Sequence, residues 1–140
     1  MSLVYFTDRD LGKSFPRLLL DAGVPVERHG EHFPADCPDE VWLAEVGKRG
    51  WVALTHDTRI RYKPNEKGAV IRNSVRLIDI VGKASLRDLA TSFIASRSRI
   101  ELFLKDASGP LIAKLYRASP GELAQDPHAP GRIERWFPKP

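Results

Sequence analysis

Short apolar runs that end at charged residues alternate along the chain with longer segments whose apolar positions recur every three or four residues. The runs of the first kind are residues 3–7, 24–28, 51–55, 75–81 and 111–116. Their length and their content of β-branched and aromatic residues predict strands. The segments with helical spacing are 10–21, 39–48 and 85–104, which predict amphipathic helices. Residues 30–38 are expected to form a loop, and residues 59–73 a loop with a short helix.

This alternation of strands and helices predicts an α/β fold. The expected architecture is a three-layer α/β/α sandwich with a mostly parallel sheet of four to five strands. Residues 1–118 would form this domain, with the strand at 111–116 on an edge. Residues 119–140 are rich in proline and glycine and are expected to form a poorly ordered C-terminal tail, although Trp136 and Phe137 could dock on the domain.

Composition narrows the class of protein. A chain of 140 residues is long enough for one sizeable core, so one folded domain is expected. Cys37 is the one cysteine, which excludes an internal disulfide framework and a multi-cysteine zinc site. The first ten residues lack the apolar segment of a secretory signal, and no apolar run approaches the ~20 residues of a membrane span. A cytoplasmic location is therefore expected.

Charge is distributed unevenly along the sequence. Residues 1–58 hold 10 acidic and 6 basic residues, a net charge of −4, whereas residues 59–140 hold 8 acidic and 16 basic residues, a net charge of +8. A basic part of this kind favours an anionic partner, although a solvated basic surface is also common in small proteins. Arg59, Arg61 and Lys63 lie in a polar stretch without apolar periodicity, so they are predicted at the surface.

Carboxylates follow the predicted strands. Asp8 and Asp10 come after the first strand, Asp57 comes after the third, and the loop after the second leads to Asp39 and Glu40. The carboxyl ends of parallel strands meet at one edge of a sheet, where ligands bind. Each aspartate alone is also a common helix cap or turn residue, but the three groups together indicate a site for Mg²⁺ or Mn²⁺, which prefer oxygen ligands. His56 adjoins Asp57, and neither a dinucleotide-binding glycine motif nor a Walker P-loop is present.

Three segments resemble those of the small PIN-like ribonuclease domains, many of which are the toxins of bacterial toxin–antitoxin pairs. The segments are FTDRDLG, PDEVWL and WVALTHD, and the resemblance covers residues 6–61. It implies an endoribonuclease that uses Mg²⁺ or Mn²⁺, an RNA substrate, a protein antitoxin and a possible homodimer. The metal ligands that it implies are Asp8, Asp39 and Asp57, with Glu40 and Asp10 as alternates, and Thr55 would orient the last carboxylate or a bound water.

One departure from the family pattern concerns a fourth acidic ligand. Many relatives carry a further acidic residue shortly after the THD segment, where this chain has Arg59 and Ile60. Asp10 or Asp36 would have to replace it. The carboxylates repel RNA, so Arg59, Arg61 and Lys63 are the candidates for holding its backbone.

Two functions of other classes are compatible with the same residues. A receiver-like phosphoacceptor domain also places acidic residues after its first and third strands, but it requires a lysine at the end of the fifth strand, and Lys114 lies inside the predicted strand. In a non-catalytic nucleic-acid-binding module, the basic part would bind the ligand and the aspartates would be caps. Cleavage of RNA that depends on a divalent metal ion distinguishes the nuclease from both.

Overall fold

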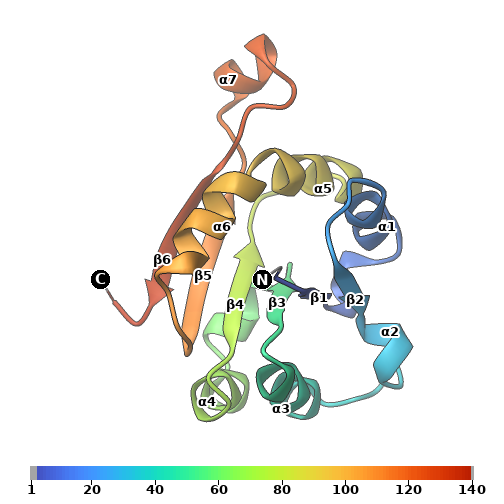
Figure 1. Ribbon diagram of the computed structural model, residues 1–140, viewed down its shortest axis with the longest axis vertical. Coiled ribbons are helices and arrows are strands. Elements are labelled where there is room, and N and C mark those ends of the chain that lie inside the picture. The colour runs from blue at the N-terminus through green and yellow to red at the C-terminus, as the bar shows by residue number, and fades with distance from the viewer. Residues whose placement is uncertain (1–2, 140) are drawn as a thin grey trace.

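A computed structural model describes residues 3–139 and contains one six-stranded sheet (Figure 1). In spatial order the strands are β2 (Val26–Arg28), β1 (Tyr5–Thr7), β3 (Val52–Thr55), β4 (Arg76–Ile80), β5 (Leu111–Tyr116) and β6 (Arg132–Phe137). The first five strands are parallel, and β6 pairs antiparallel with β5. The carboxyl ends of β1 and β3 are therefore neighbours.

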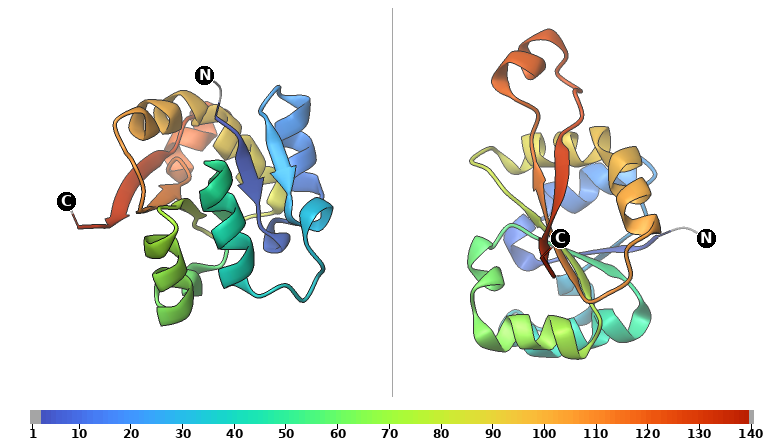
Figure 2. Two further views of the ribbon diagram at one scale, coloured as in Figure 1. Left: turned by 60° about the horizontal axis from the view of Figure 1, so that its bottom comes forward. Right: turned by 90° about the vertical axis from the view of Figure 1, so that its left-hand side faces the viewer.

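Helices cover both faces of the sheet. On one face lie α1 (Ser14–Asp21), α5 (Leu86–Ala95) and α6 (Arg97–Lys105), and on the other lie α3 (Asp39–Arg49) and α4 (Pro64–Arg72). The short helix α2 (His29–His32) follows β2. Helix α7 (Pro120–Gln125) lies in the connection between β5 and β6, which projects beyond the rest of the molecule (Figures 1 and 2). The predicted three-layer α/β/α sandwich is confirmed.

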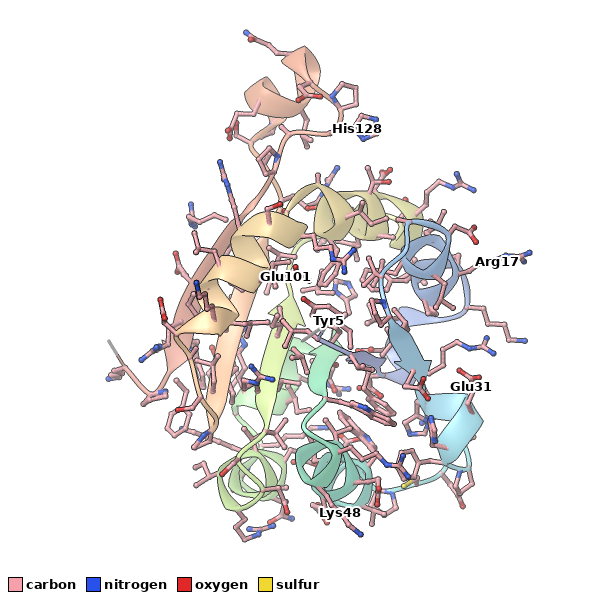
Figure 3. All side chains as sticks on the ribbon, in the orientation of Figure 1. Tyr5, Arg17, Glu31, Lys48, Glu101 and His128 are labelled. Atoms are coloured by element: carbon pink, nitrogen blue, oxygen red, sulfur yellow. The ribbon has the colours of Figure 1, made fainter. Side chains whose placement is uncertain are left out.

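The sheet buries its two faces in two separate apolar cores. Tyr5 points toward α5 and α6, where its hydroxyl donates to Glu101 Oε2 over 3.3 Å (Figure 3). The next residue, Phe6, points to the opposite face and packs against Trp42 of α3 with ring centroids 5.2 Å apart. Because side chains alternate along a strand and both faces are covered, the central strands are mainly apolar.

The expectation of a poorly ordered tail is wrong, because residues 119–139 form α7 and β6. Their prolines and glycines lie mainly at the ends of these elements. In β6, Ile133, Trp136 and Phe137 are half-buried and the other residues are exposed, and the alternation is interrupted where the register with β5 shifts. Trp136 and Phe137 pack against the core on the α3 and α4 face, which confirms that they dock. The sheet consequently has six strands instead of four to five, and its edges are β2 and β6, with β5 in the interior.

The helices differ from the sequence prediction in three places. The predicted helix 85–104 breaks at Ser96, whose hydroxyl donates to Ser92 O over 2.7 Å and accepts from the Gly131 N–H over 2.8 Å. The predicted helix 10–21 divides into a 3₁₀ helix (Arg9–Leu11) and α1, because Gly12 between them has φ of 63°. The predicted loop 30–38 contains α2. Residues 59–73 form a loop region with a 3₁₀ helix (Thr58–Arg61) and α4, close to the prediction. No helix within residues 3–139 combines the length and apolarity needed to cross a membrane.

Candidate functional site

Asp8 and Thr55 lie side by side because they come from the carboxyl ends of two hydrogen-bonded strands. Asp8 directly follows β1, and its N–H donates to Leu54 O of β3 over 3.0 Å. Thr55 is the last residue of β3, and its side chain lies on the α3 side of the sheet, as Ala53 does. The loop after β1 then carries a second carboxylate, Asp10, and the loop after β3 carries Asp57.

The hydroxyl of Thr55 joins three of these carboxylate-bearing residues. Its oxygen lies 3.1 Å from Asp8 Oδ2 and 3.1 Å from Asp10 Oδ2, and it accepts the Asp57 N–H over 3.1 Å. A hydroxyl has one proton to donate, so the two carboxylates share it. The His56 N–H donates to the same Asp10 oxygen over 3.0 Å. Asp10, named from the sequence only as an alternate, is thus at the centre of the cluster.

Burial and mutual repulsion disfavour the charged forms of this pair. Burial raises the pKa of Asp8 to about 7, and the charges of Asp10 and Asp39 add to the rise. Burial also raises the pKa of Asp10, with a contribution from the charge of Asp57. Hydrogen bonds from Thr55 and from the Arg9 and His56 backbones oppose these shifts. Asp8 therefore lies within electrostatic range of Asp10 and Asp39, and Asp10 within range of Asp57, whereas the charge of His56 lowers the pKa of Asp10. Within residues 3–139, no arginine or lysine forms an ion pair with Asp8 or Asp10.

Asp39 faces the cluster from the start of α3. It is the first residue of the helix and not its cap, which is Pro38, so a capping role does not account for Asp39. Its Oδ1 accepts the Trp42 indole N–H over 2.9 Å, a bond that fixes the carboxylate on the core. Within residues 3–139, no hydrogen bond or ion pair connects the Glu40 side chain with a residue of the site.

Asp57 differs from the other aspartates because cations neutralise it. Arg59 Nε lies 3.1 Å from Asp57 Oδ1, and Lys63 Nζ lies 3.9 Å from Oδ2. Burial alone raises the pKa of Asp57, but the hydrogen bonds and charge of Arg59 and the charge of Lys63 outweigh it, so the pKa lies below its usual value. Arg59 is 77% exposed and Lys63 is 40% exposed, as expected for surface residues.

The expectation that Arg61 lies on the surface is wrong. Its side chain is buried, and its Nε lies 2.9 Å from Oδ2 of Asp79, which is fully buried in β4. Arg61 is the last residue of the 3₁₀ helix after Asp57, whose turn directs it inward. The sequence analysis missed Asp79. The signal that could have identified it is that Asp79 is the one carboxylate in the apolar run VRLIDIV, and a charge buried in a strand requires a partner.

His56 contacts a carboxylate of the site through its backbone N–H, whereas its ring bonds to a neighbouring strand. Its Nδ1 lies 2.6 Å from Ile80 O, and because a carbonyl only accepts hydrogen bonds, the proton of the neutral ring is on Nδ1. This bond attaches the loop after β3 to the end of β4. The geometry thus assembles Asp8, Asp10 and Thr55, with Asp39 and Asp57 around them.

A family model described as a PIN-like domain matches residues 3–81, which is more than half of the chain. The chain belongs to the PIN-like domain family. No curated protein and no solved structure matches it significantly. The PIN-like match spans β1 to β4 and includes every carboxylate of the site, whereas α5 to α7, β5 and β6 lie outside it.

The PIN-like family implies a divalent metal ion, and the donor set fits it in part. Asp8 and Asp10 supply adjacent carboxylate oxygens, the ligand type that Mg²⁺ and Mn²⁺ prefer, and their raised pKa values mark an uncompensated pair that a cation would neutralise. Nevertheless, no three His, Cys, Asp or Glu side chains within residues 3–139 are grouped closely enough to hold one ion. In this arrangement Asp39 Oδ1 accepts from Trp42, and Asp57 pairs with Arg59 and Lys63.

Proposed function

We propose that this PIN-like protein is an endoribonuclease that depends on Mg²⁺ or Mn²⁺ and acts as the toxin of a toxin–antitoxin pair. The observation that carries the proposal is the pair Asp8 and Asp10, joined through the Thr55 hydroxyl at the carboxyl ends of β1 and β3. A protein antitoxin as partner and a homodimer are part of the same proposal. RNA is the proposed substrate because the basic residues of the second half of the chain adjoin the carboxylates.

The chain would divide the work of phosphodiester hydrolysis among its residues. Asp8 and Asp10 would hold a divalent ion, whose chemistry would be to activate a water as nucleophile and to stabilise charge on the phosphate. Thr55 and the His56 N–H hold the carboxylates in place, and Trp42 holds Asp39 toward them. Arg59 and Lys63 are exposed cations within reach of Asp57, where they can bind phosphates of the RNA backbone.

A non-catalytic nucleic-acid-binding module is the second candidate, and the lack of a three-ligand group within residues 3–139 favours it. The receiver-like alternative has no such support. Lys114 aligns with Asp79 in the middle of β5 instead of following the strand, and its ammonium lies over the Tyr116 ring at 5.4 Å.

The deciding experiment measures cleavage of an end-labelled single-stranded RNA by the purified protein. We expect cleavage with Mg²⁺ or Mn²⁺, none with EDTA, and recovery when Mn²⁺ is added in excess over the chelator. Asp10→Asn keeps the size of the side chain and removes its charge, so the variant should be inactive. RNA binding without cleavage under all metal conditions would support the binding module instead.

Asp39 and Glu40 can be separated by paired substitutions. Asp39→Asn retains an oxygen that can accept the Trp42 N–H, so we expect a large loss of cleavage with little change in melting temperature. Glu40→Gln should leave most of the activity. The measurement is the cleavage rate at saturating Mn²⁺ beside a thermal unfolding curve, and the reverse order of rates would assign the metal to Glu40.

Arg59 and Lys63 should contribute to RNA affinity through charge. In the double variant Arg59→Gln and Lys63→Gln, the slope of log affinity against log salt concentration should fall by roughly 0.7 for each lost phosphate contact. Binding of an inactive Asp10→Asn protein to single-stranded RNA at several salt concentrations measures this slope. Lys48→Gln, an exposed lysine at the end of α3, is the control. An unchanged slope in the double variant would place the RNA elsewhere.

A further inference from the structure

Beside the carboxylates lies an aromatic–cation cluster formed by Tyr62, Trp136, Arg61 and Lys67. Tyr62 follows the 3₁₀ helix Thr58–Arg61 and meets Trp136 of β6 edge to face, with ring centroids 5.6 Å apart. The Arg61 guanidinium lies 5.2 Å from the Tyr62 ring centroid and 5.5 Å from that of Trp136. Lys67 Nζ of α4 lies 5.3 Å from the Trp136 ring. The cluster connects β6, which is outside the family match, with the segment that follows Asp57.

Tyr62 is held in position although most of its surface is in solvent. It is 67% exposed, one of the most exposed large apolar side chains within residues 3–139. Trp136 and Arg61 contact it, and Arg61 is itself fixed by the buried carboxylate of Asp79 at 2.9 Å. An exposed ring that its neighbours already orient loses little conformational freedom when a ligand binds. The remaining surface of the ring is available to a flat partner.

The surroundings of Tyr62 are cationic and reach the carboxylate site. The preceding residue, Arg61, contacts Asp79, and the following residue, Lys63, lies 3.9 Å from Asp57 Oδ2. Lys67 adds a third cation, over the Trp136 ring. An exposed aromatic ring among cations is the combination with which proteins bind single-stranded nucleic acids, because the ring stacks on a base and the cations bind phosphates.

We propose that Tyr62 stacks on an unpaired base of single-stranded RNA next to the carboxylate site, and that Lys63 and Lys67 bind the flanking phosphates. Trp136 and Arg61 are positioning residues that orient the ring. The identity of the ligand rests on the proposed function, but the contact is a binding event and needs no cleavage. Bases inside a duplex are already stacked, so the site selects single strands.

The test measures binding of a fluorescein-labelled single-stranded decaadenylate to the inactive Asp8→Asn protein by anisotropy. Tyr62→Ala should weaken binding roughly 5- to 150-fold, the range found for loss of one stacked base, and Tyr62→Phe should keep the affinity. The salt slope should stay the same in Tyr62→Ala, whereas Lys67→Gln should lower it by roughly 0.7. Trp136→Leu should also weaken binding, and Trp136→Phe should restore it. A blunt RNA duplex should bind equally to all Tyr62 variants.

Leu102→Ala is the matched control, because Leu102 is 68% exposed but lies on α6, on the opposite face of the sheet. Unchanged affinity in Tyr62→Ala would overturn the proposal and leave the exposed ring for contact with a protein partner. Loss of duplex binding equal to that of the single strand, or no RNA binding by any form, would overturn it as well. The nuclease proposal can fail independently of the stacking proposal. If the wild-type protein binds RNA through Tyr62 but cleaves no RNA under any metal condition, the stacking proposal stands and the nuclease proposal is wrong.

Discussion

Asp8→Asn is expected to abolish RNA cleavage and, at the same time, to make the metal-free protein more stable near neutral pH. The two effects have one cause. In the folded protein, Asp8 is partly buried beside the charges of Asp10 and Asp39, and no arginine or lysine of residues 3–139 forms an ion pair with it, so its charge is destabilising. The same uncompensated charge is what attracts a divalent ion. Asparagine retains the size of the side chain and an oxygen that can accept the Arg9 N–H at 2.7 Å, but it removes the charge.

The pH dependence of this stabilisation follows from the direction of the shift. The pKa of Asp8 rises from 3.8 in the unfolded chain to about 7 in the folded protein. The folded state therefore binds more protons than the unfolded state between these values, and wild-type stability falls as pH increases from about 4 to about 7. Above pH 7 the full cost is present. After allowance for partial exposure of the group, we expect Asp8→Asn to add roughly 2–3 kcal/mol there, or about 5–10 °C in Tm.

Thermal unfolding in EDTA at pH 5 and pH 8 tests this expectation. The difference in Tm between Asp8→Asn and wild type should be large at pH 8 and small at pH 5. Asp36→Asn is the control, because Asp36 is exposed in the loop before α3 and should affect neither stability nor cleavage. A destabilised Asp8→Asn protein at pH 8 would mean that the hydrogen bonds of the carboxylate outweigh its burial. Loss of cleavage in Asp36→Asn would instead make it the fourth acidic ligand.

The part of this fold that the sequence predicts is the part in which local pattern and tertiary environment agree. The strands β1 and β3 are short apolar runs because the sheet buries both faces, and each ends at a threonine that is followed by polar residues. Strand β4 is also mainly apolar, but it contains Arg76 and Asp79. The same regularity predicts that Asp8, Thr55 and Asp57 lie at one edge of the sheet. Asp10 is harder to assign from the sequence, because its role depends on the Gly12 turn, whose φ of 63° ends the 3₁₀ helix and separates Asp10 from α1.

Long-range contacts account for what the sequence did not predict. Strand β6 is stabilised by pairing with β5 and by packing of Trp136 and Phe137, and neither contact has a local signal. The break between α5 and α6 depends on Ser96 accepting the Gly131 N–H, a contact across 35 positions. Arg61 was expected at the surface because its neighbours are polar, but the partner that draws it inward, Asp79, is far away in sequence.

The buried pair of Arg61 and Asp79 should be the most sensitive electrostatic contact in the protein. We expect Arg61→Met to destabilise the fold by about 3 kcal/mol or more at pH 8, because it leaves Asp79 buried without a cation. Even with Arg61 present, burial raises the pKa of Asp79 to about 6. Neither of its oxygens has a well-aligned hydrogen-bond donor within residues 3–139, so the ion pair offsets only part of the burial.

This destabilisation should depend on pH in a defined direction. Without Arg61 the pKa of Asp79 should rise further above its unfolded value of 3.8, because the cation that lowers it is gone. At pH 5 the carboxyl group of Asp79 would then be protonated, and burying the neutral form destabilises the protein little. At pH 8 folding requires either that Asp79 takes up a proton from solution or that its charge is buried, and both destabilise the folded protein. The free energy lost in Arg61→Met should therefore increase from pH 5 to pH 8.

Arg59→Met is a close control, because Arg59 forms an ion pair with Asp57 two residues away but is 77% exposed. Exposed ion pairs contribute little to stability because solvent screens them, so this variant should unfold almost like the wild type at both pH values. The double variant Arg61→Met and Asp79→Leu removes both buried charges and should recover most of the stability lost in Arg61→Met. Urea unfolding of the four proteins at pH 5 and pH 8 measures each step. A double variant no more stable than Arg61→Met would show that Arg61 acts through its contacts with Tyr62 and Trp136, and not through neutralisation of Asp79.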